Sequence, residues 1–199
     1  MDIRERIIEE ASRQFLNYGI RNVTMDGIAA ELGISKRTVY ETFKDKTELV
    51  YTCLNNITKQ HEERNLEILS TSRNVIETIF AFMIDGIKAM ASINEVFFFD
   101  MKKLYPVKWN SIQEENERKI YNLTRQLLDK GIKEELFRKD ININIVAKLF
   151  YHQMNLLADE KIFPRDEYNY PDVFKSLTIN FMRGISTKKG IDIIDKRME

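Results

Sequence analysis

Apolar residues recur three and four positions apart along most of the 199-residue chain, which is the spacing of one face of an α-helix. Glycine (7) and proline (3), which commonly interrupt helices, are scarce, and residues 34–85 contain neither. No segment alternates apolar and polar residues around a hairpin turn, as paired strands would. The pattern therefore predicts an all-α protein of about nine helices.

Three short helices are predicted near the N-terminus, each with a recognisable start or stop signal. An apolar stripe runs through Ile7–Tyr18, and Gly19 follows it where a left-handed helix end favours glycine. Thr24 is a favourable N-cap for a second helix of only two turns, which Gly33 ends. Ser35 then caps the third helix. A tight turn is therefore expected between the second and third helices.

The third helix is predicted to have an apolar and a polar face. Val39 and Phe43 are four residues apart and share one side. The other side carries Lys36, Tyr40 and Lys44. Asp45, followed three residues later by Glu48, has the spacing of a capping box, so a long fourth helix is expected to begin at Lys46.

Long amphipathic helices are predicted for the remainder of the chain. Their expected ranges are 74–92, 94–105, 107–130, 142–158 and 171–188. The polar and aromatic segment 161–170 is the best candidate for a loop, because Pro164 and Pro171 disfavour helix there. Residues 191–199 are expected to form a last turn or to fray.

The three short helices have the order and the glycine turn of a helix-turn-helix motif. In this motif the second helix of the pair turns apolar side chains inward and presents hydrogen-bonding side chains to the major groove of DNA. The outward set here is Lys36, Arg37, Thr38, Tyr40 and Lys44. From Gly33 to Lys46 four basic residues oppose two acidic ones, although the whole chain is balanced at 31 of each. A solvated helix face is the alternative, and the glycine turn and the helix caps favour DNA binding over it.

The segment Thr24–Leu49, TMDGIAAELGISKRTVYETFKDKTEL, resembles the DNA-binding segment of the tetracycline-repressor (TetR) family. The resemblance extends back over the first helix and covers about the first 55 residues. Gly27 departs from the pattern and costs up to about 1 kcal/mol of helix stability relative to alanine. The resemblance implies a DNA-binding domain at residues 1–48 and a helical ligand-binding and dimerisation domain at residues 49–199.

Carried over residue by residue, the resemblance implies two kinds of DNA contact. Thr24 would cap its helix and touch a phosphate, and Tyr40 would hydrogen-bond another phosphate through its hydroxyl. Lys44 and Lys46 would also hold the DNA backbone. The residues at the groove would be Ser35, Lys36, Arg37 and Thr38. General chemistry agrees, because hydroxyls and lysines serve phosphates, whereas an arginine such as Arg37 can fork onto guanine.

A single reading unit touches only a few base pairs, so specific binding of double-stranded DNA predicts a two-fold homodimer on a palindromic operator. The helices at 142–158 and 171–188 each carry two apolar stripes, one of which could serve the core and the other a partner. The resemblance implies that these last two long helices form a four-helix bundle between subunits. The alternative is that both are buried on two sides within one monomer.

Aromatic side chains are concentrated in the middle helices. Such residues are more often plain core, but the TetR resemblance implies that an unknown small-molecule effector binds between these helices. The candidate ligand-binding residues are Phe80, Phe98, Tyr105, Trp109 and Tyr121. The resemblance thus implies a transcriptional repressor that an apolar or aromatic effector releases from DNA by tilting the fourth helix. The alternatives are an activator, or a helical interaction protein that does not depend on DNA binding.

No cofactor, metal site or enzyme activity is expected. Cys53 is the only cysteine, which excludes zinc sites built from several cysteines. A di-iron bundle would need a glutamate three residues before each histidine. The residues three positions before His61 and His152 are Thr58 and Leu149, so neither histidine fits this pattern. The HExxH zinc motif is also missing.

Neither export nor membrane insertion is expected, and a cytoplasmic location is predicted. Residues 1–10 carry four acidic side chains and no apolar run, unlike a signal peptide. The most apolar stretch, Val75–Met101, is interrupted by five charged residues and lacks the roughly 20 consecutive apolar residues of a membrane span. A single cysteine fits a reducing compartment.

Overall fold

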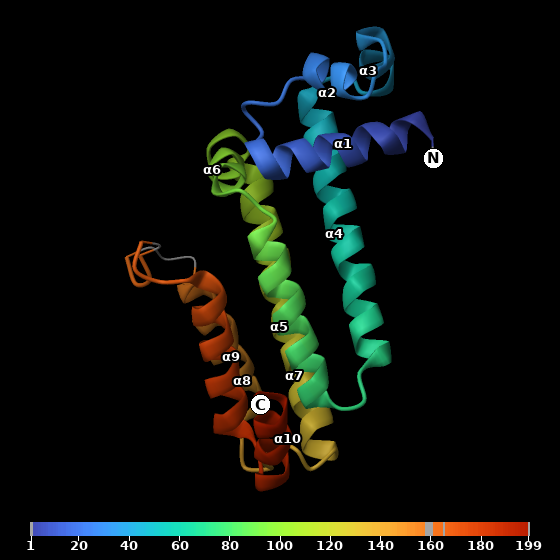
Figure 1. The fold of residues 1–199 in the computed structure, drawn as a ribbon. Helices are drawn as coiled ribbons and strands as arrows, with labels where there is room; N and C mark the ends of the chain where they lie inside the picture. The colour runs from blue at the N-terminus through green and yellow to red at the C-terminus, as the bar shows by residue number, and fades with distance from the viewer. Residues whose placement is uncertain (1, 158–160, 165, 199) are drawn as a thin grey trace. The chain divides into compact units, whose positions relative to one another are not determined.

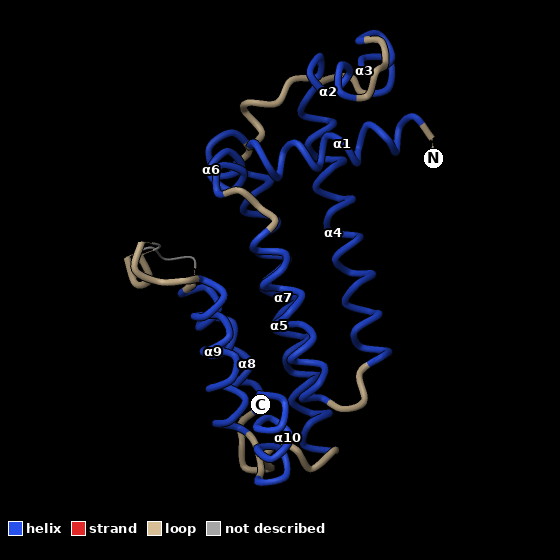
Figure 2. The backbone as a smooth tube through the Cα atoms, in the orientation of Figure 1, coloured by secondary structure: helices blue, strands red, loops and turns tan. Residues whose placement is uncertain are grey.

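The computed structural model describes residues 2–157, 161–164 and 166–198, and these residues form ten helices and no strand (Figures 1 and 2). The all-α class predicted from the sequence is confirmed. The helices are α1 (Ile3–Tyr18), α2 (Met25–Glu31), α3 (Lys36–Thr42), α4 (Lys46–Thr71), α5 (Val75–Ala91), α6 (Glu95–Leu104), α7 (Pro106–Lys133), α8 (Ile143–Leu156), α9 (Tyr170–Ile185) and α10 (Lys188–Met198).

The C-terminal end differs from the sequence prediction, which expected one helix over 171–188. Helix α9 ends at Ile185, and Ser186 is extended, with φ −81° and ψ 149°. Ser186 forms an isolated antiparallel bridge with Phe137, and the Arg138 N–H donates to the Ile185 carbonyl at 2.8 Å. These long-range bonds stop the helix, and the chain then begins α10 instead of a last turn. Residues 158 and 165, predicted to end a helix and to lie in a loop, fall outside the described residues.

The chain folds as two compact units. The first contains the residues up to Glu67 together with Lys88–Asn110, and the second contains Ile68–Ile87 together with the residues from Ser111 onward. Helix α6 therefore belongs to the same unit as the short N-terminal helices. The predicted boundary after residue 48 follows the DNA-binding motif alone, whereas these units follow the packing of the chain.

The core of the first unit is built from the apolar stripes that the sequence predicts. Its fully buried large side chains are Phe15, Phe43, Ile7, Ile20, Ile28, Leu49 and Met101. The guanidinium of Arg4 lies over the Phe43 ring, 4.8 Å from its centroid, and covers one edge of this core. The capping box predicted at the start of α4 is present in part. The Glu48 N–H donates to Asp45 Oδ1 at 2.9 Å, and the Glu48 carboxylate accepts from the N–H of Lys44.

The second unit has a continuous apolar core of its own. Its members come from α5, α7, α8, α9 and α10 and from the turn that follows α7, and they are Val75, Ile76, Ile79, Phe80, Met83, Leu127, Leu128, Leu136, Phe137, Ala147, Ile179, Met182, Ile185 and Ile194. The turn closes tightly, because the N–H groups of Leu136 and Phe137 both donate to the Gly131 carbonyl, at 2.9 and 3.0 Å. Gly131 lets the buried Phe137 ring lie directly against the helix backbone.

Cys53 on α4 is buried in the first unit, and its thiol donates weakly to the Ile8 carbonyl at 3.6 Å. Burial raises the pKa of this thiol from 9.0 to about 11. Between these values the unfolded chain loses the thiol proton while the folded protein keeps it, so stability falls as pH rises from about 9 to 11. We expect this loss to be about 2 to 3 kcal/mol, and to vanish in Cys53→Ala.

Urea unfolding of the two proteins at several pH values between 8 and 11 tests this expectation. The difference in unfolding free energy between wild type and Cys53→Ala removes the contributions of every other titrating group. Two curves that run parallel through this range would contradict it.

Candidate DNA-binding site

The turn between α2 and α3 is built from two caps and one glycine. Thr24 Oγ1 accepts from the N–H of Gly27 at 3.0 Å and begins α2. Gly33 has φ +64°, the left-handed conformation that glycine adopts without strain. The N–H of Ile34 donates to the Ala29 carbonyl at 3.0 Å, and Ser35 Oγ accepts from the N–H of Thr38 at 3.1 Å. These bonds set the two short helices at a sharp turn, as the sequence predicts.

Helix α3 separates its apolar and polar residues as a reading helix requires. Val39 is fully buried and Phe43, the C-cap residue, is buried with it. The exposed residues on the other faces include Lys36, Arg37 and Tyr40, whose side chain is 52% exposed. Ser35 Oγ lies 2.8 Å from Thr38 Oγ1, so the two hydroxyls at the start of α3 are held together. The polar N-terminal end of the helix is therefore free to meet DNA.

Two ion pairs hold the basic side chains of α3 in the absence of DNA. Lys36 Nζ lies 2.5 Å from Asp26 Oδ2 on α2, and this carboxylate raises the pKa of Lys36. Arg37 Nε lies 2.7 Å from Glu41 Oε1, one turn along the same helix. Both pairs are exposed, where an ion pair contributes about 0 to 1 kcal/mol, so DNA phosphates or bases can replace the carboxylates at little cost.

The remaining predicted backbone contacts lie at the starts of α2 and α4. Thr24 and Lys44 are exposed. Lys46 is half-buried at the first position of α4, and burial lowers its pKa, while the negative charge of Asp100 opposes that shift. A phosphate near Lys46 would favour its charged form for the same reason as Asp100 does.

A contact that the sequence analysis missed joins α6 to the end of α1. The Asp100 carboxylate, only 3% exposed, accepts from the backbone N–H of Arg21 at 2.7 Å. The N–H of Asn94 donates to the Leu16 carbonyl at 2.8 Å. Gly19 has φ +80°, and a methyl group there would come within 2.5 Å of Val96. The available signal was Asp100 itself, a lone charge inside the apolar run 96–101.

Asp100→Ala is expected to destabilise the protein by about 1 to 3 kcal/mol, because it leaves the Arg21 N–H without its acceptor. Asp100→Asn keeps an acceptor oxygen and should recover part of the loss. Glu9→Ala, which removes an exposed carboxylate from α1, is the control and should change stability by less than about 0.5 kcal/mol. Urea denaturation measures all three, and equal stability of Asp100→Ala and the control would contradict the expectation.

The structure does not bring the five aromatic candidates for effector binding into one site. Phe80 is buried in the core of the second unit. Phe98 and Trp109 belong to the first unit and meet edge to face at 6.2 Å between centroids. Tyr105, also in the first unit, packs in the same way on Tyr51 at 5.9 Å. The fifth candidate, Tyr121, lines a pocket in the second unit. A shared role for these residues stays a prediction.

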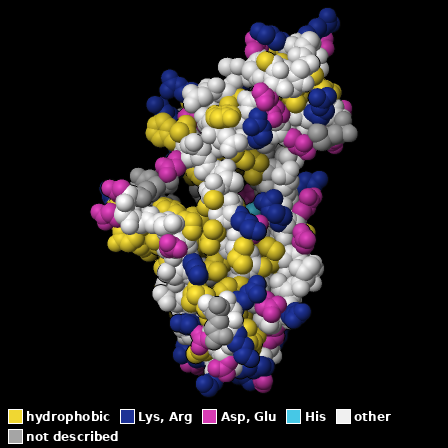
Figure 3. All heavy atoms as spheres, in the orientation of Figure 1, with side chains coloured by type: hydrophobic (Ala, Val, Ile, Leu, Met, Phe, Trp, Pro, Cys, Tyr) yellow, Lys and Arg dark blue, Asp and Glu magenta, His cyan; other side chains and the backbone are white. Residues whose placement is uncertain are grey.

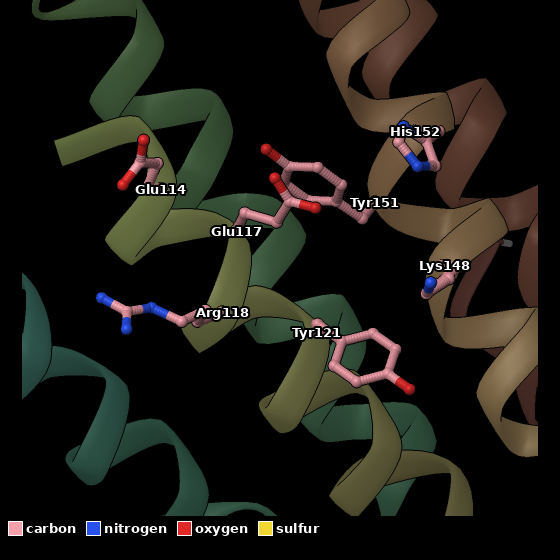
Figure 4. Close-up of a pocket in the computed structure, with 7 residues that line it drawn as sticks. All are labelled: Glu114, Glu117, Arg118, Tyr121, Lys148, Tyr151 and His152. Carbon is pink, nitrogen blue, oxygen red and sulfur yellow. The ribbon is translucent and has the colours of Figure 1, made fainter. Parts of the chain in front are cut away.

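The pocket that Tyr121 lines lies between α7 and α8 and measures about 390 Å³ (Figure 4). The side chains that surround it are Glu114, Glu117, Arg118, Tyr121, Lys148, Tyr151 and His152. Only Tyr121 was a candidate beforehand, although Glu114, Glu117 and Tyr121 repeat three and four residues apart on one helix face. Sequence spacing on α7 alone does not reveal which helix lies opposite.

Among the residues that the structure describes, no group of three or more potential metal ligands comes together. In the same part of the chain, no helix is long and apolar enough to cross a membrane.

Comparison with known proteins agrees with the geometry of the first unit. Residues 7–51 match the family model described as bacterial regulatory proteins, tetR family. The chain is 22% identical to the uncharacterized HTH-type transcriptional regulator YvaF of Bacillus subtilis (strain 168), over 94% of this chain and 98% of that protein. It is 40% identical over 68 residues to an HTH-type transcriptional regulator of Staphylococcus aureus (strain USA300), a match covering 34% of this chain and 32% of that protein.

The fold is shared with solved regulators. The structure of a regulator from Saccharomonospora viridis in complex with choline matches with a TM-score of 0.74 at 20% identity, over 93% of this chain and 98% of that one. The capped turn and the polar face of α3 define a helix-turn-helix DNA-binding protein. Residues 7–51 are similar to the tetR family of bacterial regulatory proteins, and the chain is a DNA-binding transcriptional regulator. TetR-family regulators bind DNA and form dimers.

Proposed function

We propose that this regulator is a repressor that binds a palindromic operator as a homodimer and leaves it when a small molecule binds. The observation that carries the proposal is the exposed, capped and basic N-terminal end of α3, whose apolar side is buried. Such a helix can enter a major groove of about 12 Å and present hydrogen-bonding side chains to the bases. The site of action is the cytoplasm, where operator DNA is available.

Each exposed polar residue of the reading unit then has a role. On binding DNA, the Arg37 side chain leaves its ion pair with Glu41 and contacts the edge of a base instead. Its guanidinium can donate two hydrogen bonds to guanine. Ser35, Lys36 and Thr38 reach the groove beside it. The DNA backbone is held by the residues around the helix starts, which are Thr24, Tyr40, Lys44 and Lys46.

The homodimer is proposed to form through α8 and α9. Ile145, Leu149 and Leu156 share one side of α8 and are 41–56% exposed, whereas Ala147 and Tyr151 face the core. On α9 the core takes Ile179, Met182 and Ile185, and Phe174 and Phe181 pack against this core while remaining only partly buried. Apolar side chains gather on the surface over α9 and the adjoining part of α5 (Figure 3). A four-helix bundle between subunits would cover such surfaces.

The pocket between α7 and α8 is proposed as the effector site. The related fold from Saccharomonospora viridis holds choline, which supports the idea that this architecture accommodates a small molecule. Effector binding would tilt α4, change the spacing of the two reading units and weaken the operator complex by a coupling of about 1 to 3 kcal/mol.

Selection of bound fragments from random duplex DNA at one stated salt concentration tests the proposal, because affinity for DNA depends steeply on salt. Wild type is expected to enrich a palindrome, and Arg37→Ala/Tyr40→Phe to lose it. The matched control is Arg73→Ala/Tyr168→Phe, which makes the same changes at exposed positions outside the reading unit and should enrich the same palindrome. Failure of folded wild type to enrich any sequence would overturn the proposal. A reporter gene behind the palindrome distinguishes repression from activation.

A further inference from the structure

The pocket between α7 and α8 carries opposite charges on its two walls. Glu114 and Glu117 are three residues apart and place two carboxylates on the α7 side. Lys148, on the α8 side, supplies an ammonium group. His152 lies one turn further along α8. Arg118 also lines the pocket on the α7 side, and its guanidinium extends away from α8, whereas Glu117 extends toward α8 (Figure 4).

These charges have not neutralised one another. Within the described part of the chain, no ion pair or hydrogen bond involves the side chains of Glu114, Glu117 or Lys148. Neighbouring charges on α7 behave differently: Lys119 pairs with Glu115 at 2.7 Å, and Lys133 pairs with Asp129 at 2.5 Å. The two walls therefore hold complementary charges apart across the pocket, and each charge keeps an unused bonding position.

Two tyrosines supply apolar surface between the charged walls. Tyr151, which is 9% exposed, reaches into the pocket from α8, and Glu117 extends toward it from α7 (Figure 4). Tyr121 is held in place at both ends, because its hydroxyl donates to Asn144 Oδ1 at 3.4 Å and Arg125 lies 5.7 Å from its ring centroid. An aromatic ring can pack a flat apolar body, and its face attracts a cation.

We propose that this pocket binds a small zwitterion. Its ammonium group faces Glu114 and Glu117, its carboxylate faces Lys148, and its apolar body packs against Tyr121 and Tyr151. A ligand with both charges supplies a charged partner to each wall, whereas a simple cation or anion leaves the exposed charge of the other wall to water. The inference rests on the proposed function, because it names the chemical class of the effector.

Three compounds with the same phenyl skeleton separate the charge requirements. Phenylalanine carries both charges, phenethylamine carries only the ammonium group, and 3-phenylpropionate carries only the carboxylate. Isothermal titration calorimetry on the full-length protein is expected to give phenylalanine an affinity at least about tenfold above that of either singly charged compound. Equal binding of phenethylamine and phenylalanine, or no binding of any of the three at millimolar concentration, would overturn the proposal.

Variants of the two walls make the test specific to this pocket. Glu117→Gln is expected to weaken the binding of phenylalanine about tenfold, because the partner of its ammonium group is lost. The affinity for 3-phenylpropionate, which has no ammonium group, should stay unchanged. Lys148→Met is expected to weaken the binding of phenylalanine by a similar factor and to leave the affinity for phenethylamine unchanged. Glu115→Gln, which removes the neighbouring carboxylate that pairs with Lys119, is the matched control and should bind all three compounds as wild type does. Equal loss in Glu115→Gln and Glu117→Gln would place the binding elsewhere.

Operator affinity measured with the same compounds separates this inference from the proposed function. Zwitterion binding that leaves operator affinity unchanged would support the ligand class and contradict the effector role of the pocket. Release from the operator by a compound whose binding is insensitive to Glu117→Gln and Lys148→Met would support regulation by an effector and overturn the inference.

Discussion

Leu149→Glu is expected to convert the protein from a dimer to a monomer and to weaken operator binding by about two orders of magnitude or more. Leu149 is 55% exposed on α8 and lies between Ile145 and Leu156 on the same side of the helix. In the proposed dimer this stripe is covered by the partner, and a buried, unpaired carboxylate there is strongly unfavourable. Each monomer then binds one half-site of the operator independently, and the gain in affinity from simultaneous contact with both half-sites is lost.

Analytical ultracentrifugation and operator titration, both at one protein concentration and one salt concentration, measure the two effects. Leu66→Glu is the matched control, because Leu66 is 66% exposed on α4 and the substitution is chemically identical. It should leave the protein dimeric with unchanged operator affinity. A dimeric Leu149→Glu protein with wild-type operator affinity would show that α8 is not the interface.

Gly131→Ala is expected to lower the free energy of unfolding by about 1 to 3 kcal/mol, although alanine is the better helix former. A methyl group at Gly131 would overlap the ring of Phe137, which is fully buried and cannot move outward. The same ring belongs to the turn that donates two hydrogen bonds to the Gly131 carbonyl. Relief of the overlap would therefore disturb the junction of α7 with the C-terminal segment.

Gly184→Ala on α9 serves as the control for this substitution, because a methyl group there meets no atom within 4 Å. Only the difference in helix propensity between glycine and alanine then changes the free energy of unfolding. This variant should therefore be more stable than wild type by about 0.5 to 1 kcal/mol. Thermal and urea unfolding of both variants measure the difference. Stabilisation of the protein by Gly131→Ala would contradict the packing described here.

The helix-turn-helix unit could be predicted almost completely because local rules specify it. Thr24, Ser35 and Gly33 act on backbone groups within a few residues, so their effects can be predicted from spacing alone. The inward direction of Val39 likewise follows from the period of the helix. The predicted DNA contacts of the polar face remain untested, since they depend on DNA.

The split between α9 and α10 could not be predicted in the same way. Residues 186–190 carry no apolar side chain, so apolar periodicity does not fix where α9 ends and α10 begins. What ends α9 is the pairing of Ser186 with Phe137, which lies far away in the sequence. The contact of Asp100 with Arg21 is of the same kind, because a carboxylate in an apolar run signals a buried partner without identifying it.

The sequence by itself determined the helical class, the position of nearly every helix and the DNA-reading motif, because helix periods, caps and glycine turns act between residues close in the chain. The tertiary structure alone decided which helices meet. It placed α6 against the end of α1, and it brought Lys148 and Tyr151 of α8 opposite Glu117 and Tyr121 of α7. Such meetings depend on side-chain packing between distant segments, and local spacing carries no information about which distant face will be the partner.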